Sequence, residues 1–398
     1  MSSRDQFLKT VNHQQSNRVV LDFGATAVSG IHVETLSKLR RHYGLQRKPI
    51  RIIEPYQMLG EVGWELIDSI GIDIIGAWGK NNRFGFHNHA PFKEWKTPWG
   101  QRVMLPLKFN TSGNSTGDVL MHLGGDTSQA VCATMPKTAY EFESIEKEPE
   151  DKTAKIELTI PDLISETDLE HWRVEVDKAY FSGKAVIADF GGTSLGNIPE
   201  LYQKKSIQFD KIKIHLERLG ERAIENLKRI FAVLGNKVNA VVLCDTNFGT
   251  EKTSYSSAEQ FDAFYLPYYK QLNEWIHENT QWKTFKHSKG IVDKLLESFV
   301  KAGFDIINPV ETFASGLPLE KLKEKFGKDL VFWGGGIDTR TVLPFGKPED
   351  VRAQVLNNCE ILSKNGGFVF SPVNNIPPNV PVENMVALFE AIKEFNGK

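Results

Sequence analysis

Short apolar runs in the second half of the chain each end in polar residues, and a helical pattern separates one run from the next. The runs with the residues after them are Val241–Cys244 with Asp245–Asn247, Trp282–Lys286 with His287–Gly290, Phe304–Ile307 with Asn308–Glu311, Val331–Trp333 with Gly334–Thr339, and Phe368–Phe370 with Ser371–Asn375. Strands that alternate with helices pair in parallel. In a closed barrel of parallel strands, all the strand C-termini lie on one face, which carries the active site. The pattern therefore predicts both a fold and the location of a site.

The length of the chain suits one such barrel with an insertion. A (β/α)8 barrel needs roughly 250 residues and tolerates large insertions, and this chain has 398. From about residue 80 to 155, Asn, His, Gly, Pro and Trp are frequent and no long helical pattern occurs. That stretch is too long for a plain connection. We predict one domain over residues 1–398, a (β/α)8 TIM barrel with an inserted irregular or β segment at about 80–155.

Two or three of the barrel strands are expected before the insertion. Apolar runs at 18–24, 50–53 and 73–76 are the candidates, and residues 58–70 have the spacing of a helix. No glycine-rich motif follows a strand with the spacing that a dinucleotide-binding fold requires. A closed barrel is therefore favoured over an open sheet.

Composition narrows the class of function. The net charge is −2 and the basic residues are scattered along the sequence, which gives no case for binding nucleic acid or an anionic membrane. Three cysteines are too few and too separated for a disulfide framework. Residues 1–17 are polar rather than secretory, and no run is long enough for a membrane span. We expect a cytoplasmic protein that acts on a small molecule; the oligomeric state stays open, a homodimer included.

His287 and Lys289 are the first candidates for catalysis. They follow a predicted strand two residues apart, so both side chains can face the barrel mouth. Such a pair suits proton transfer or the binding of an anionic substrate; the alternative is a solvated Lys289 and a His287 that caps a neighbour. Asp245 and Glu311 also follow strands and could orient His287, fix a substrate or act as general base. Their alternatives are ordinary turn or helix-start roles.

Other polar residues at predicted strand ends are candidates for binding a substrate. They are Asn374, Asp338, Gly335, Asn247, His32 and Gln57. Asp338 equally suits a turn, and the glycines before it either let a ligand approach the backbone or relieve packing. His87 and His89 have a spacing used by some metal sites, but a solvated or aromatic-packed pair is favoured because no strand clearly carries them.

Several strand-end segments together form a recognisable pattern. They are His287, Asn308–Glu311, Trp333–Thr339, Leu343–Gly346 and Ser371–Pro381, with weaker support from Ser29–His32 and Tyr56–Glu61. The pattern resembles the uroporphyrinogen decarboxylase superfamily, and most of all its branch of cobalamin-dependent methyltransferases. The resemblance covers most of the chain outside the insertion and is most specific in the C-terminal third. It implies a (β/α)8 barrel with its site at the strand C-termini.

The chain departs from that pattern at two places. Uroporphyrinogen decarboxylases carry an early Arg-Gln-Ala-Gly-Arg motif that holds the acidic porphyrinogen, whereas the equivalent loop here, 23–28, has no arginine. The methyltransferases hold zinc with a His-x-Cys pair and a third ligand near the last strand. Here Lys289 replaces the cysteine and Asn374 falls at the third position, and neither a protonated lysine nor a carboxamide is a good zinc ligand. Of the usual metal ligands only His287 remains, so no cofactor is firmly predicted; zinc rebuilt from His287 with Asp245 or Glu311 is the minority case.

The resemblance and its departures lead to three hypotheses about function. The first is a corrinoid-linked methyltransferase that acts on a small polar or anionic substrate, with cobalamin carried by a partner protein. In that case Lys289 places a fixed positive charge where the metal charge would have been, and stabilises an anion. The second is a metal-independent decarboxylase or related lyase of the same superfamily. The third is a catalytically inactive binding protein, because fold alone does not decide activity.

Overall fold

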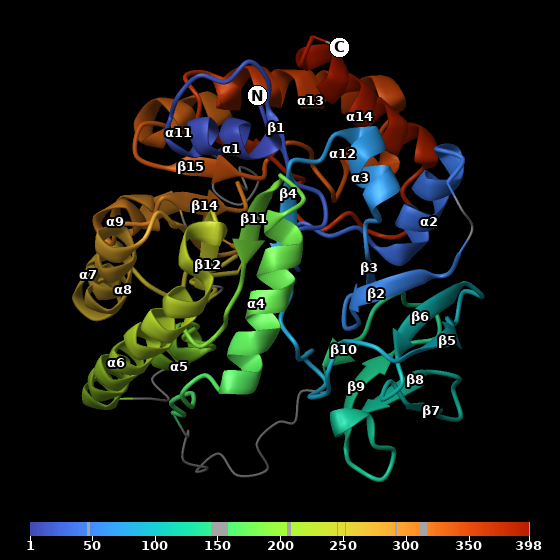
Figure 1. The fold of residues 1–398 in the computed structure, drawn as a ribbon, viewed down its shortest axis with the longest axis horizontal. Coiled ribbons are helices and arrows are strands. Elements are labelled where there is room, and N and C mark those ends of the chain that lie inside the picture. Colours follow the sequence, from blue (N-terminus) through green and yellow to red (C-terminus); the bar gives the residue numbers. More distant parts are fainter. Residues whose placement is uncertain are drawn as a thin grey trace.

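Eight parallel strands form a nearly closed barrel, which confirms the predicted (β/α)8 fold (Figure 1). The computed structural model describes residues 1–45, 48–144, 158–204, 208–244, 246–250, 252–290, 293–310 and 317–397. In barrel order the strands are β1 (Val20–Leu21), β16 (Phe368–Phe370), β15 (Val331–Trp333), β14 (Ile306–Asn308), β13 (Lys283–His287), β12 (Ala240–Cys244), β11 (Ala185–Ala188) and β4 (Ile74–Ala77). Asp73 joins β4 to β1: its N–H donates to the Leu21 carbonyl at 3.0 Å, and its carboxylate accepts from the Leu21 N–H at 3.0 Å.

The barrel interior is apolar because alternate strand residues point inward. The inward side chains are Val20, Ile74, Ala185, Ile187, Ala240, Phe285, Ile306, Val331, Trp333 and Val369. Helix α1 (Ser3–Val11) adds Phe7 and Val11 to this cluster, and Thr10 accepts a hydrogen bond from Gly367 just before β16. Helix α1 therefore covers the end of the barrel where the strands begin, and the opposite end is left for a site.

Helices alternate with the barrel strands and cover them. They are α2 (Val33–His42), α3 (Trp64–Ile70), α4 (Glu166–Tyr180), α5 (Ile198–Gln203), α6 (Phe209–Leu234), α7 (Ala258–Phe264), α8 (Leu266–Asn279), α9 (Leu296–Lys301), α11 (Leu319–Phe326), α12 (Val342–Phe345), α13 (Pro348–Ser363) and α14 (Val382–Phe395). Helical periodicity in the sequence predicts helices over 209–234, 348–363 and 382–395, and α6, α13 and α14 have these bounds. Helix α13 begins with a proline and two acidic residues, which suit the first turn of a helix.

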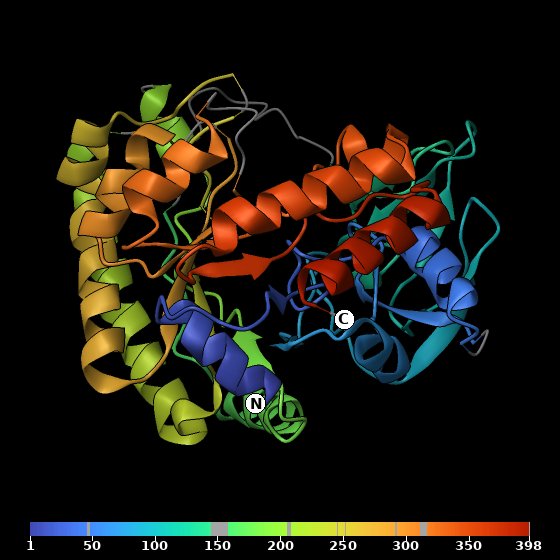
Figure 2. The ribbon, with the colours of Figure 1, turned by 90° about the horizontal axis from the view of Figure 1, so that it is seen from above.

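Two four-stranded sheets lie beside the barrel (Figure 1). The first has the order β3 (Leu59–Gly60), β2 (Ile50–Glu54), β6 (Arg102–Pro106), β5 (Phe92–Lys96); the second, antiparallel throughout, has the order β10 (Glu143–Ser144), β9 (Val131–Met135), β8 (Val119–His122), β7 (Thr111–Gly113). In Figure 2, these blue and teal elements lie at the opposite end of the molecule from the yellow helices.

The structure corrects two predictions made before the insertion. The run at 50–53 is not a barrel strand, because β2 pairs with β3 and β6. Residues 58–70 are not one helix: β3 comes first, and α3 begins only at Trp64, after Gly60 and Gly63. Gly60 packs closely enough against Leu36 that an added Cβ would lie 2.7 Å from its side chain.

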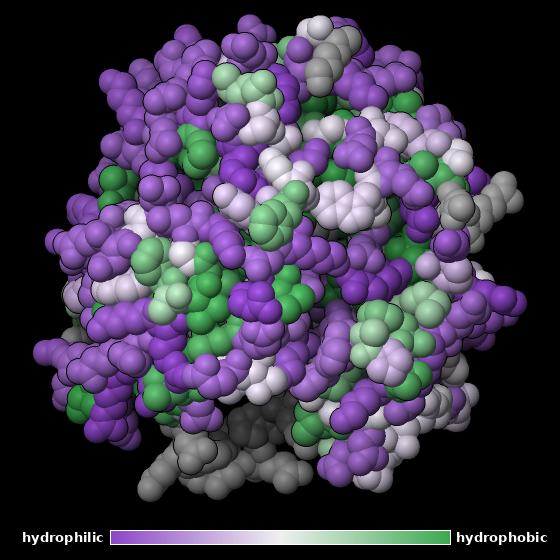
Figure 3. Space-filling view, in the orientation of Figure 1, coloured by the Kyte–Doolittle hydropathy of each residue, from purple (hydrophilic) through white to green (hydrophobic). Residues whose placement is uncertain are grey.

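Within the described residues, none of the helices has both the length and the apolar character needed to cross a bilayer. The face drawn in Figure 3 is mostly hydrophilic, and its hydrophobic residues form small separate groups.

Candidate active site at the barrel mouth

His287 ends β13 on the inward face, two residues after the core residue Phe285, and is only 6% exposed. Its Nδ1 lies 2.6 Å from Oδ1 of Asn308 at the end of β14. The Asn308 amide is oriented by a second contact, since its Nδ2 donates to the Trp333 carbonyl at 2.8 Å. Because the Asn308 oxygen can only accept, Nδ1 of His287 carries a proton, and in the neutral form of the ring Nε2 would hold the lone pair. This tautomer suits a base or an acceptor of a substrate hydrogen bond.

The loop that carries Lys289 is fixed by the loop after β12. The Lys289 N–H donates to Oδ1 of Asn247 at 2.9 Å, and Oγ of Ser288 accepts from the Phe248 N–H at 3.1 Å. Gly290 has a φ of +90°, and a Cβ there would lie 2.6 Å from the Gly249 carbonyl carbon. These contacts hold the backbone in place while the Lys289 side chain stays exposed.

Lys286 lies on the other face of β13 and is fully buried. Its ammonium donates to the carbonyls of Thr246 at 2.7 Å and His287 at 2.6 Å, and lies over the rings of Phe248 and Phe299. It thus ties the loop after β12 to the end of β13. Sequence reasoning overlooked this residue; the only signal was its place between the inward Phe285 and His287, which turns it outward.

Asp22 and Ser371 add buried polar groups at the ends of β1 and β16. Asp22 is fully buried; its Oδ2 accepts from Nε1 of Trp333 at 2.8 Å, and its Oδ1 accepts from the Ala25 N–H at 3.1 Å. Burial raises the pKa of Asp22 to about 6, against the lowering effect of these hydrogen bonds. Ser371 is two residues after the inward Val369, and its buried Oγ has no hydrogen-bond partner in the described parts of the chain. In the sequence, Asp22 stands out only as the acidic residue near the end of the apolar run at 18–24.

The Gln57 side chain is hydrogen-bonded to the loop after the last barrel strand, β16. The described contact is with Asn375 and not with the neighbouring predicted residue Asn374. The Asn375 amide donates to Oε1 of Gln57 and to the Ala27 carbonyl, both at 2.8 Å, and its Oδ1 accepts from the Gly30 N–H at 2.7 Å. The loops after β1, β2 and β16 therefore share one hydrogen-bond network. Asn374, the predicted substrate contact, is partly exposed beside it.

His32, Asp338 and Gly335 make contacts within the fold. His32 accepts from the Glu34 N–H through Nδ1 and donates from Nε2 to the Tyr140 carbonyl, and burial lowers its pKa to about 4. The Asp338 carboxylate accepts from the Arg340 and Thr341 N–H groups of the following turn. Gly335 has a φ of +80°, and a Cβ there would lie 2.8 Å from Cβ of Val310. That His32, Asp338 and Gly335 contact a substrate stays a prediction.

The described residues do not by themselves complete the zinc site that the resemblance to the methyltransferases implies. Asp245 and Glu311 lie outside the described residues. Across the described residues, no group of three or more His, Cys, Asp or Glu side chains is placed to hold a metal ion. His87 and His89 have ring centroids 5.0 Å apart, and a pair alone does not complete such a group. With Lys289 and Asn374 at the co-ligand positions, the described donor set does not fit zinc.

Glu141, between β9 and β10, is a charged group that the sequence did not point to. Its neighbours are anchored: the Tyr140 carbonyl accepts from His32, and the Phe142 N–H donates to the Tyr56 carbonyl at 2.9 Å. Although Glu141 is exposed at the surface, partial desolvation by the protein around its carboxyl group raises its pKa, and the positive charge of Lys289 partly offsets that rise. The second sheet therefore brings a carboxyl group into the electrostatic range of Lys289.

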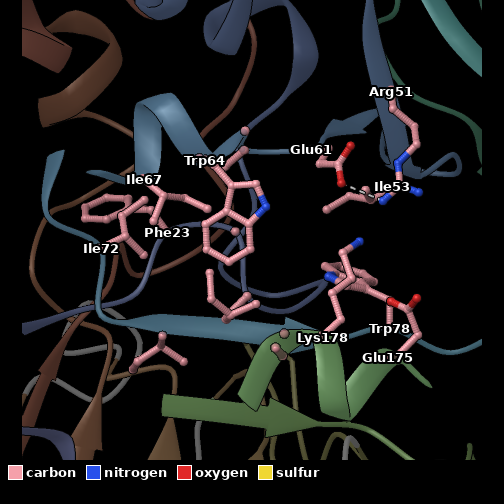
Figure 4. Close-up of a pocket in the computed structure, with 18 residues that line it drawn as sticks. Phe23, Arg51, Ile53, Glu61, Trp64, Ile67, Ile72, Trp78, Glu175 and Lys178 are labelled. Atoms are coloured by element: carbon pink, nitrogen blue, oxygen red, sulfur yellow. Dashed lines mark hydrogen bonds and ion pairs between the residues drawn. The ribbon is translucent and has the colours of Figure 1, made fainter. Parts of the chain in front are cut away.

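A separate pocket of about 200 Å³ opens on the outer wall of the barrel, between α3, α4 and β4 (Figure 4). Trp64 and Ile67 form one side of it, and the Arg51–Glu61 ion pair, at 2.7 Å, stands at its rim near Lys178. Its positive and negative side chains balance. It contains none of the predicted site residues.

The fold and the residues at its mouth define a parallel (β/α)8 barrel with a polar site at the strand C-termini. Residues 210–395 match the family model of uroporphyrinogen decarboxylase. A uroporphyrinogen decarboxylase of Methylococcus capsulatus is 23% identical over 250 residues, which are 60% of this chain and 68% of that protein. A methyltransferase from Methanosarcina mazei has a similar fold, with a TM-score of 0.53, 13% identity and 99% of each chain covered. These matches show that residues 210–395 are similar to the uroporphyrinogen decarboxylase family, and that the chain as a whole has the fold of the Methanosarcina mazei methyltransferase.

Proposed function

We propose that this barrel is a methyltransferase that moves a methyl group between a small anionic substrate and a corrinoid held by a partner protein. The observation that carries the proposal is that His287 at the end of β13, whose Nδ1 donates to Asn308, is followed two residues later by an exposed Lys289 whose backbone is held by Asn247. The fold shared with the Methanosarcina mazei methyltransferase supports this branch of the superfamily. When bound, the corrinoid supplies the cobalt that accepts or donates the methyl group.

The chain's own residues would bind the substrate and handle its charge. The Lys289 ammonium pairs with a carboxylate or phenolate group and stabilises negative charge that develops on the substrate. His287 accepts a substrate hydrogen bond at Nε2, because Asn308 keeps the proton on Nδ1. Asp245 and Glu311 remain proposed acid–base or orienting groups. Asn247 positions the Lys289 backbone.

Methyl transfer to a reduced corrinoid protein tests the proposal. Purified chain, a Co(I) corrinoid protein and a panel of methoxylated aromatic carboxylates are mixed, and the corrinoid absorbance reports the methylated cofactor. We expect Lys289→Met to raise the KM roughly ten- to hundredfold, the value of one charge-assisted contact, and Lys289→Arg to restore most of it. Lys178→Met, which changes an exposed lysine outside the mouth, is the matched control. Absence of methylated corrinoid with every donor and partner would contradict methyl transfer.

A decarboxylase or lyase that needs no metal is the second candidate. The uroporphyrinogen decarboxylase of Methylococcus capsulatus favours it, because that relative is matched over 68% of its length. The same site chemistry serves this reaction, since Lys289 would stabilise the carbanion formed as carbon dioxide leaves. Release of carbon dioxide from the same panel without any corrinoid protein distinguishes it. A site that neither methylates nor decarboxylates, but still binds an anion through Lys289, would match an inactive binding protein.

A further inference from the structure

A second pocket lies away from the barrel mouth, between the end of α2 and the sheet that contains β2, β5 and β6. Its volume is about 360 Å³. The residues that line it are Ser37, Arg40, Arg41, Leu45, Lys48, Pro49, Ile50, Glu94, Gln101 and Arg102. Elements far apart in the sequence therefore share one hollow.

The pocket has a strong excess of positive charge. Arg40, Arg41, Lys48 and Arg102 are cationic, and Glu94 is the one acidic residue among those that line it. Glu94 lies 3.6 Å from Arg102, but both side chains are more than half exposed, so this ion pair neutralises little. The side chains of Arg41 and Lys48 make no hydrogen bond or ion pair with any other described residue. The chain as a whole has a net charge of −2, so the local excess is not a consequence of composition.

A structural role explains only part of this cluster. Arg40 and Arg41 stand in the last turn of α2, where cations interact favourably with the helix dipole. Lys48 precedes β2, and Arg102 begins β6. Neither belongs to α2, and both still line the same hollow as its last turn. The tertiary fold, rather than the helix end alone, gathers the positive charge.

We propose that this pocket binds a small organic phosphate. Arginine and lysine are the side chains that pair best with phosphate oxygens, and two of those in the pocket have no partner among the described residues. Leu45, Pro49 and Ile50 give one side of the pocket an apolar surface, and its volume exceeds that of a bare phosphate. A phosphate monoester with a small apolar group matches both parts of the lining.

The position of the pocket gives binding a structural consequence. A ligand there contacts the last turn of α2 and β6 of the neighbouring sheet. It therefore holds that sheet against the barrel. This inference does not depend on the reaction proposed for the mouth.

Calorimetric titration with phenyl phosphate tests the proposal, with inorganic phosphate and benzoate as comparison probes at constant ionic strength. We expect one saturable site per chain, tighter for phenyl phosphate than for either comparison probe, and a higher melting temperature with phenyl phosphate present. The double variant Arg41→Gln/Lys48→Gln should weaken binding at least tenfold. It removes two exposed, unpaired charges, so its fold is checked by circular dichroism and by the unchanged activity at the mouth.

A control variant separates a specific site from general charge. Lys178→Gln/Lys228→Gln removes two exposed lysines on α4 and α6, outside the pocket, and should bind phenyl phosphate as the unmodified chain does. The proposal is overturned by any of three results: no saturable binding, equal loss in both double variants, or a pocket variant with full affinity. Equal binding of benzoate and phenyl phosphate would also refute it.

Discussion

The buried carboxyl group of Asp22 makes a quantitative prediction about stability and pH. Burial raises its pKa from 3.8 to about 6 in the folded chain. A raised acid pKa means that the folded state binds the proton more tightly than the unfolded state does. The stabilising contribution is thus fully present below the unfolded pKa and is lost as pH rises through the folded pKa.

The size of the effect follows from the two pKa values. A shift of one unit corresponds to about 1.4 kcal/mol, so the whole contribution is about 3 kcal/mol. Between pH 4 and pH 7, linkage predicts that the free energy of unfolding falls by about 2.4 kcal/mol on account of Asp22 alone. Asp22→Asn removes this titration and keeps a similar shape. The variant has a stability offset that does not depend on pH, because the Trp333 and Ala25 N–H groups bind different carboxylate oxygens, and one of these becomes an NH2 group that cannot accept.

Urea unfolding of the two proteins at pH 4, 5, 6 and 7 measures the effect. Every other group titrates equally in both proteins, so the difference between their unfolding free energies isolates Asp22. Asp22→Asn should gain about 2.4 kcal/mol relative to the parent chain from pH 4 to pH 7. Tryptophan fluorescence should report the same transition, because Trp333 donates to this carboxylate. A difference that stays constant within about 0.5 kcal/mol, or that slopes the other way, would refute the burial argument.

Three further predictions concern the loop and the histidine. Asn308→Leu removes the acceptor that fixes the His287 tautomer and should lower kcat/KM for methyl transfer about 10- to 100-fold. Asn308→Asp keeps an acceptor and should therefore lose less activity. Equal kcat/KM values for the two variants would contradict the tautomer argument. Gly290→Ala should lower the melting temperature more than Gly183→Ala. Both glycines have a positive φ, where an alanine costs about 1–3 kcal/mol of strain, but only at Gly290 would the added Cβ also clash with backbone atoms. Equal shifts in melting temperature would count against this prediction. Lys289→Cys should bind zinc measured by elemental analysis, and a variant that binds none and keeps full activity would disprove the electrostatic replacement.

Local patterns in the sequence were enough to predict much of the barrel. The bounds of α6, α13 and α14 were predictable because helical periodicity and the residues that favour a first turn are local features, which lie within the segment that forms the helix. The short run at 50–53 was assigned wrongly to the barrel for the opposite reason. Its apolar residues show that it is a strand, but whether β2 pairs with a barrel strand or with β6 depends on a segment 50 residues later.

The site was predictable in position but not in detail. Strand ends located His287, and alternation placed it at the mouth. No sequence pattern could show that Asn308 orients its ring, or that Lys286 holds the backbone carbonyl beside it from the outer face. These contacts depend on the relative register of β13 and β14 and on how neighbouring loops pack. The same holds for Glu141, which reaches Lys289 only through the fold of the second sheet.

The electrostatics around Lys289 add a step to the proposed function. Partial desolvation has already raised the pKa of Glu141, and only the positive charge of Lys289 counteracts that rise. An anionic substrate that pairs with Lys289 would cancel this positive charge and place a like charge near the carboxylate, so the pKa of Glu141 would rise further. Binding would then favour the protonated form of Glu141. On this reasoning, Lys289 is proposed to do more than hold a substrate. It also makes the protonation of a nearby acid depend on whether the anion is bound.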